Sequence, residues 1–344
     1  MAKIKSPRAT FNFCEPQSRW DDRFNTFKKT TMKNIQYIAF LLSSFLLLNC
    51  GGENFFDSIV EVEIPPHEAN LAVTAHLTNL DELFSLVFVT RTIGVLDDQA
   101  AEPITDAQVE LYSDGQLLQT YEYIELFQNI DRNGDTIIRD AYFVENPVPL
   151  VASQTYELRV SSPIYGEVMA TQALPQPTPI ISVTYEEDGV ADIFDDFGGI
   201  RADEITINFQ DEATEKNYYL AEVFPCYLNP DVEDCLVTSP YLVPVDPATE
   251  VGVKGSSLLL SDATFNGKAH ELKIATKIET DNLKRIEVIL YNISEDRYLH
   301  ELSLVNYQDN EDNPFAEPVI VHENITNGNG IFTLSSGSVF TIEF

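Results

Sequence analysis

The amino-acid sequence predicts a mainly β fold: an N-terminal antiparallel sandwich of immunoglobulin or transthyretin type, then a C-terminal antiparallel β-domain with one packed helix. Three observations carry this prediction. Short stretches in which apolar and polar residues alternate recur along the chain, separated by residues typical of turns. Apolar residues make up 44% of the chain, which is enough to fill substantial cores. Three prolines within residues 174–179 indicate a boundary between the two parts.

Before the first strand, residues 32–49 have the pattern of a lipoprotein signal peptide. Lys33 gives the positively charged start, and the uncharged apolar run after it is shorter than the roughly 20 residues of a membrane span. Cys50 then occupies the position of lipidation. Leu47 fits the usual pattern before that cysteine, whereas Asn49 is larger than the small residue usually found there. The alternatives are a buried helix or a plain membrane anchor with an incidental cysteine.

The segments on either side of this stretch are interpreted differently. Residues 1–31 contain seven basic residues and no apolar periodicity, so we interpret them as a mis-assigned N-terminal extension, with Met32 as the natural start. Residues 50–69 are acidic and contain Pro65 and Pro66, which disfavour a helix. We therefore expect residues 50–69 to comprise the lipidated cysteine and a tether.

The expected mature protein is strongly acidic. Loss of residues 1–49 removes 8 basic and 3 acidic residues and leaves 13 basic against 52 acidic residues, a formal charge of −39. Because clustered lysine and arginine are needed to bind phosphate backbones, this composition argues against nucleic-acid binding. It also predicts membrane attachment through a lipid rather than a basic patch. The acidity fits a cationic ligand or a basic partner, and it equally fits the solubility of an exported protein.

Residues 70–174 are predicted to form the N-terminal sandwich from about seven short strands. In the first of them, Leu71, Val73, Ala75 and Leu77 alternate on one face. A turn at residues 113–116 predicts a hairpin. The strands are expected at residues 71–77, 83–90, 107–111, 117–124, 141–144, 155–160 and 166–173.

Residues 175–179 are interpreted as a proline-rich linker, and residues 180–344 as the C-terminal β-domain. Its one helix is expected near residues 294–307, because Ser294 suits the N-cap and Glu295 and Asp296 suit the first turn. Its strands are expected at residues 180–185, 204–209, 218–224, 271–278, 284–291 and 339–344.

Cys226 and Cys235 lie close together in a loop that contains proline and aspartate, and we expect them to form a disulfide. A metal-binding pair and a redox pair are the alternatives. Eight residues separate the two cysteines, so they do not form a C-x-x-C motif, and no histidine is near them in the sequence.

Asp131, Asn133 and Asp135 occupy positions 1, 3 and 5 of a calcium-binding loop. The later positions do not match, since Thr136 stands at the glycine position and Tyr142 at the glutamate position. A hairpin turn explains the same residues, so the sequence predicts no cofactor here beyond a possible calcium ion.

The sequence contains no recognisable catalytic set. The five histidines are scattered singly, and no serine stands in a G-x-S-x-G motif. We therefore expect a protein that is not an enzyme. The alternative is a hydrolase that uses carboxylates not recognised as a motif.

The order of these features resembles a family of Bacteroidota outer-membrane lipoproteins of unknown function. The resemblance spans nearly the whole mature chain and rests on Cys50, on IPPHEANLAVTAHLT, on RTIGVLDD followed by PITDAQVELY, on TYELRV, on FNGKAHELKI, on ISEDRYLHEL and on NPFAEPVIVHENITNGNGIF. The last block is the most specific. Asn49 and Asn329 depart from the family pattern.

This resemblance implies a function, because such proteins are often encoded beside TonB-dependent transporters. We expect a lipid-anchored outer-membrane protein that acts as a non-catalytic accessory or ligand-binding partner of such a transporter. The alternative is a structural or adhesive envelope protein that uses an immunoglobulin-like module for protein contacts. The resemblance implies no catalytic or binding residues.

Overall fold

The computed structural model describes residues 67–80, 85–94, 101–130, 136–194, 200–213, 215–229, 234–310 and 315–344. These residues belong to one compact unit, Pro66–Phe344. The predicted N-terminal extension, the signal peptide, Cys50, the tether up to residue 66 and the predicted calcium loop lie outside the described residues.

Within the described residues, thirteen strands form one continuous sheet. A short strand, β11 (Leu236–Val237), pairs with β10 beside the main path. The order along that path is β13 (Thr249–Val251), β14 (Ser257–Ser261), β10 (Tyr218–Tyr227), β16 (Leu283–Ile293), β17 (Asn329–Glu343), β1 (Leu71–Thr78), β2 (Val87–Arg91), β5 (Thr136–Phe143), β4 (Gln116–Ile130), β3 (Gln108–Ser113), β6 (Thr155–Ser162) and β7 (Gly166–Ala173).

A second, four-stranded sheet belongs to the C-terminal part. Its order is β12 (Val243–Pro244), β15 (Ala269–Thr276), β9 (Ile200–Gln210) and β8 (Ile180–Phe194). The α-helix of the described chain is α2 (Glu295–Asn310), and two short 3-10 helices lie at Val253–Gly255 and Asp262–Thr264. The prediction of a mainly β protein with antiparallel sheets and one packed helix is therefore confirmed for the described residues.

The N-terminal core forms because the long sheet folds over on itself. The first half of β4 pairs with β3 and its second half pairs with β5, so this strand joins two parts of the sheet. The buried residues of β1 and β2 then pack with those of β3, β6 and β7 in one cluster. In β1 the alternation acts as predicted, since Leu71, Val73, Ala75 and Leu77 are at most 1% exposed.

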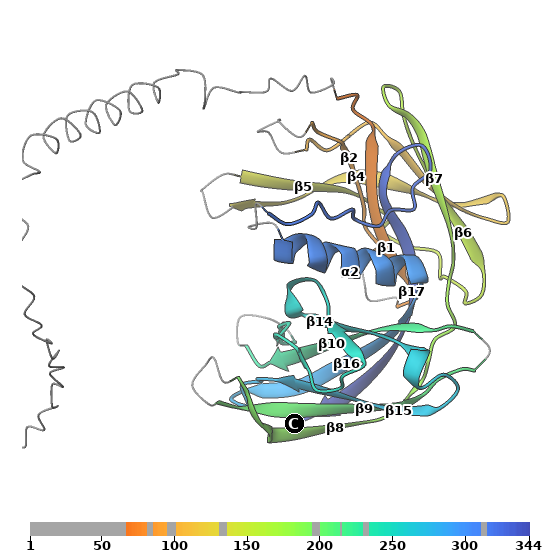
Figure 1. Ribbon diagram of the computed structural model, residues 1–344. Helices are drawn as coiled ribbons and strands as arrows, with labels where there is room; N and C mark the ends of the chain where they lie inside the picture. The colour runs from red at the N-terminus through yellow and green to blue at the C-terminus, as the bar shows by residue number, and fades with distance from the viewer. Residues whose placement is uncertain are drawn as a thin grey trace, which may run out of the picture. The chain divides into compact units, whose positions relative to one another are not determined.

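The C-terminal core lies between the four-stranded sheet and the strands β10, β14 and β16. Alternate residues of β10 face opposite sides of its sheet. Tyr219, Ala221 and Val223 point into this core, whereas Tyr218 and Leu220 belong to a smaller cluster on the other face. Helix α2 lies beside β14, β10 and β16 (Figure 1). It packs on that other face through Tyr298 and Leu302.

Strand β17 takes part in both cores. Its first residues pair in parallel with β1, from Ala72 opposite Asn329 to Thr78 opposite Ser335. Its remaining residues pair antiparallel with β16. Phe332 and Leu334 belong to the N-terminal core, so residues 329–335 complete the N-terminal part, although the predicted division assigned them to the C-terminal domain 180–344. The predicted linker at 175–179 is coil between β7 and β8.

Several element boundaries differ from the predictions. The last strand begins at Asn329, ten residues before the predicted start at residue 339. The prediction missed the first part of this strand because Gly328 and Gly330 suit a turn, whereas in the structure they allow neighbouring strands to pack closely. Strand β14 was not predicted. The predicted hairpin is confirmed, with Asp114 and Gly115 at positive φ in its turn.

Candidate functional site

A cavity of about 400 Å³ lies where α2 covers the strands β10, β16, β17 and β1. Its polar lining comes from His76, Thr78, Glu222, Tyr291, Arg297 and Ser335. Its apolar lining comes from Leu86, Leu220 and Ile293. The volume lies at the small end of the range of about 300–1,000 Å³ for ligand pockets, so a small molecule fits better than a polymer.

The strand pattern explains why these side chains share one face. Leu220 and Glu222 are two residues apart on β10, and Tyr291 and Ile293 are two residues apart on β16. Leu220 stands opposite Tyr291 in the antiparallel ladder. On β1, His76 alternates with the core residues Ala75 and Leu77, which places it on the side away from the N-terminal core.

Glu222 is the carboxyl group of the cavity. Burial raises its pKa to about 7. The Arg297 charge and a hydrogen bond from the Tyr291 hydroxyl lower the pKa, while the Glu301 charge raises it. Burial also raises the pKa of Tyr291, so the Tyr291 hydroxyl keeps its proton and donates a hydrogen bond to Glu222. Glu222 therefore changes its charge near neutral pH.

Arg297 and Glu301 form an ion pair along α2, with Nε and Oε1 2.7 Å apart. They are four residues apart and therefore lie on the same side of the helix. Both are largely buried, with side chains 19% and 9% exposed. The charge of the Arg297 guanidinium is thus balanced within the helix.

Two histidines next to the cavity are neutral. Burial holds the pKa of His76 well below its ordinary value, and the nearby charge of Arg297 lowers it further. His76 Nδ1 lies 2.7 Å from the Thr333 hydroxyl. Burial likewise lowers the pKa of His300, whose Nδ1 donates to the main-chain oxygen of His322 at 2.7 Å. The two rings are 6.1 Å apart.

Residues 315–328, which we call the strap, precede β17 and are held on helix α2 by polar contacts. His322 Nε2 lies 2.7 Å from Asp296 Oδ1. The main-chain nitrogen of His322 donates to Ser303 Oγ at 2.9 Å. Asn324 donates to Asp296 at 3.2 Å and exchanges two hydrogen bonds of 2.8 Å with the main chain of Phe332. The strap thus fixes α2 over the start of β17.

Residues 57–340 match a family model described as a domain of unknown function, DUF4249. The chain belongs to the DUF4249 family. No curated protein matches it. In the described part of this DUF4249 protein, no helix is long and apolar enough to cross a membrane.

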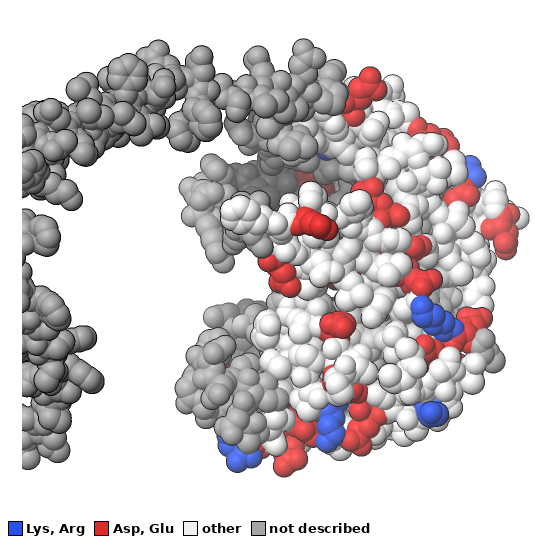
Figure 2. Space-filling model, viewed as in Figure 1, with Lys and Arg blue, Asp and Glu red and all other residues white. Residues whose placement is uncertain are grey.

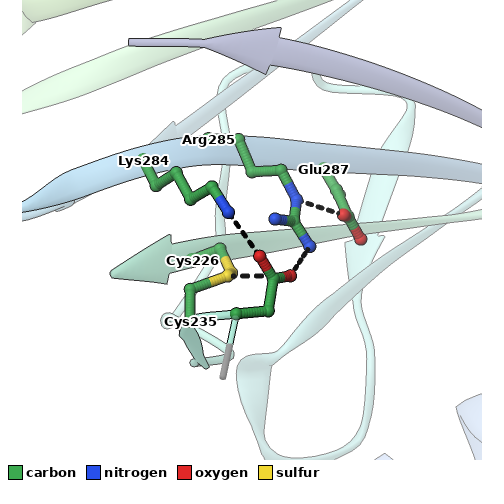
Figure 3. Close-up of a disulfide and its surroundings, with 6 residues drawn as sticks. Cys226, Cys235, Lys284, Arg285 and Glu287 are labelled. Atoms are coloured by element: carbon green, nitrogen blue, oxygen red, sulfur yellow. Dashed lines mark hydrogen bonds and ion pairs between the residues drawn. A yellow bond between two sulfur atoms is a disulfide. The ribbon is translucent and has the colours of Figure 1, made fainter. Parts of the chain in front are cut away.

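Cys226 and Cys235 are joined as a disulfide in the DUF4249 domain, with Cα atoms 5.5 Å apart (Figure 3). It links the end of β10 to the residue before β11. Asp234 Oδ2 lies 2.8 Å from Arg285, and Asp234 also pairs with Lys284. Hydrogen bonds from these two residues lower the pKa of Asp234 to about 2. Because the two sulfur atoms are bonded to each other, they offer no thiolate to a metal.

Glu222, His76 and Arg297 were not predicted as site residues. Two signals in the sequence point toward them. His76 stands at a polar position of an alternating strand, and Glu222 interrupts the apolar stretch from Tyr218 to Phe224. Neither signal shows that the two residues share a cavity with Arg297, because the pairing of β1 with β17 spans more than 250 residues of sequence.

Proposed function

We propose that this DUF4249 protein is a lipid-anchored, non-catalytic binding protein of the bacterial outer membrane that serves a TonB-dependent transporter. The observation that carries the binding role is the cavity under α2, with six polar and three apolar side chains in its lining. Convergent polar groups in a partly apolar cavity fix the orientation of a ligand, and the rigid sheet beneath them keeps them in place.

The lipid anchor is supported by the sequence around Cys50. An apolar run after Lys33 and the cysteine that follows fit lipidation and removal of the signal peptide. The acidic surface agrees with this arrangement, because Figure 2 shows many acidic and few basic side chains on the viewed face. Such a surface gives no attraction to anionic lipids, so attachment depends on the lipid at Cys50.

The resemblance to Bacteroidota lipoproteins supports the transporter as partner. The run of about seven short strands supports an immunoglobulin or transthyretin type for the N-terminal part, in which β1 and β2 pack against β3, β6 and β7. A small-ligand site in an anchored protein suits a role that delivers a ligand to a transporter.

The test is co-purification from membranes of the native organism. The tagged protein, solubilised in mild detergent, is expected to bring down a TonB-dependent transporter that mass spectrometry identifies. Cys50→Ala is the matched variant, and it is expected to abolish lipid labelling and release the protein from the membrane. A protein that purifies without a transporter would contradict the transporter role, and a Cys50→Ala protein that stays labelled would contradict the anchor.

A structural or adhesive role is the second candidate, and one observation favours it. Three apolar side chains within two residues of the disulfide cysteines are about half exposed or more: Leu228, Leu236 and Val237. The disulfide and the ion pairs of Asp234 stiffen this hairpin, as a protein contact surface requires. Replacing Leu236 and Val237 by serine should weaken a protein complex under this second role and leave a cavity ligand unaffected.

A further inference from the structure

The cavity under α2 contains one carboxyl group, Glu222, and the Arg297 charge lowers its pKa without an ion pair between the two side chains. Arg297 is paired with Glu301, with 2.7 Å between Nε and Oε1. Glu222 forms no ion pair with any residue that the structure describes. His76 and His300 do not supply a positive charge either, because burial keeps both rings neutral.

A buried carboxylate without a counterion is costly, so the group holds a proton instead. Burial raises the pKa of Glu222 to about 7, which fits this situation. A ligand with a positive charge can replace that proton. The carboxyl group then ionises, and its charge is balanced by the ligand rather than by hydrogen.

The lining indicates which kind of cation fits. Leu86, Leu220 and Ile293 give the cavity an apolar wall, which suits a hydrocarbon body and not a hydrated metal ion. In the described residues, the group of Cys226, Asp234 and Cys235 is the one set of three ligand atoms within metal-binding reach of one another, and it lies at the disulfide. Tyr291 and the hydroxyls of Thr78 and Ser335 can accept hydrogen bonds from an ammonium group.

We propose that the cavity binds a monovalent organic amine with an apolar body, whose ammonium group pairs with the Glu222 carboxylate. This inference rests on the proposed binding function and names its ligand class. The chain carries a formal charge of −34, which raises the local concentration of cations near the protein.

The exchange at Glu222 involves no covalent bond to the ligand. The carboxyl O–H bond breaks, the proton passes to solvent, and the ammonium group, which already carries its charge, takes the place of the proton. Binding is therefore linked to release of a proton. Below a pH of about 7 the release approaches one proton per ligand, and it falls toward zero above a pH of about 8. The other charged or titratable groups around Glu222 are Arg297, Glu301, Tyr291 and His76.

The experiment uses three probes with one branched carbon skeleton: isoamylamine, isoamyl alcohol and isovalerate. Titration calorimetry with the purified protein measures their affinities, and buffers of different ionisation enthalpy give the protons released. The amine is expected to bind at least about tenfold more tightly than the alcohol, and isovalerate is expected not to bind. Glu222→Gln should bind the amine no better than the alcohol and release no proton, while Glu317→Gln, an exposed carboxyl on the strap, should behave like the wild type.

The inference is overturned if the alcohol or isovalerate binds as tightly as the amine, if no proton is released, or if none of the three binds. The comparison of probes needs the wild type alone, so it stands even if Glu222→Gln does not fold. If the amine does not bind, the transporter role is not affected, because the test of that role is co-purification and not the binding of these probes.

Discussion

Gly330 of β17 packs directly against the main chain of Val73 in β1, and a β-carbon at position 330 would overlap the Val73 carbonyl oxygen. Gly330 also has a φ of +105°, which side chains rarely adopt. The parallel pairing of β1 and β17, which closes the N-terminal core, therefore depends on the absence of a side chain at this position.

We predict that Gly330→Ala lowers the free energy of unfolding by more than about 3 kcal/mol, because overlap with the main chain of β1 adds to backbone strain. Gly115→Ala is the control. Gly115 has a φ of +74° but nothing within 4 Å of its would-be β-carbon, so strain alone should cost about 1 kcal/mol. Urea denaturation measures both changes. Equal losses would show that close packing against Val73 contributes nothing.

The Cys226–Cys235 disulfide should stabilise the C-terminal part mainly by restricting the unfolded chain. The cysteines are nine residues apart, and closing a loop of this length is expected to contribute about 2–3 kcal/mol. We predict that Cys226→Ser with Cys235→Ser lowers the free energy of unfolding by this amount. Mass spectrometry without reductant should show the wild type two hydrogens lighter than its reduced form. If reductant lowers the melting temperature of the double variant as much as that of the wild type, the effect does not come from this bond.

The sequence predicts local structure well where one strand has one buried face. Leu71, Val73, Ala75 and Leu77 alternate in the sequence and are buried in the structure. Strand β17 was predicted incompletely because it changes partner from β1 to β16 at Ser335, and its first half is marked by glycines that also suit a turn. Local pattern does not report such a change of partner.

The cavity could not be predicted from the sequence for a related reason. Its lining comes from four strands, a helix and Leu86 in the segment before β2, and these residues are spread through the chain from His76 to Ser335. Periodicity places His76 on the polar face of its strand and Arg297 in the helix, but it does not bring them together. That requires the strand order β10, β16, β17, β1, which follows from long-range pairing.

Asn324 joins the strap to both α2 and β17, and its replacement should lower the stability of the folded protein. Its side chain satisfies the main-chain N–H and C=O of Phe332, a residue that is fully buried. We predict that Asn324→Ala lowers the free energy of unfolding by about 2–4 kcal/mol, because both main-chain groups lose their partner. Chemical denaturation gives this value.

Asn310→Ala provides the matched control for Asn324→Ala. The Asn310 amide donates to the main-chain oxygen of Asn306 at an exposed position at the end of α2. Its replacement should change stability by less than about 0.5 kcal/mol. If Asn324→Ala lowers the free energy of unfolding as little as Asn310→Ala does, water replaces the lost hydrogen bonds at Phe332. The contacts of Asn324 would then contribute nothing to holding the strap in place.

Glu222 should make the stability of the protein depend on pH. Its pKa is about 7 in the folded protein, raised chiefly by burial from an ordinary value of 4.5. Between these values the folded protein holds a proton that the unfolded chain releases. The free energy of unfolding therefore falls as the pH rises from about 4.5 to about 7, and this loss remains above that range.

We predict that Glu222→Gln removes this part of the pH dependence, because glutamine has a similar shape and does not ionise. Relative to the wild type, the variant should gain up to about 3 kcal/mol between a pH of about 5 and a pH of about 8. Urea denaturation at the two pH values measures the gain, and Glu317→Gln should follow the wild type. A Glu222→Gln variant whose stability keeps the wild-type pH dependence would show that Glu222 is ionised throughout, with Arg297 rather than a proton balancing its charge.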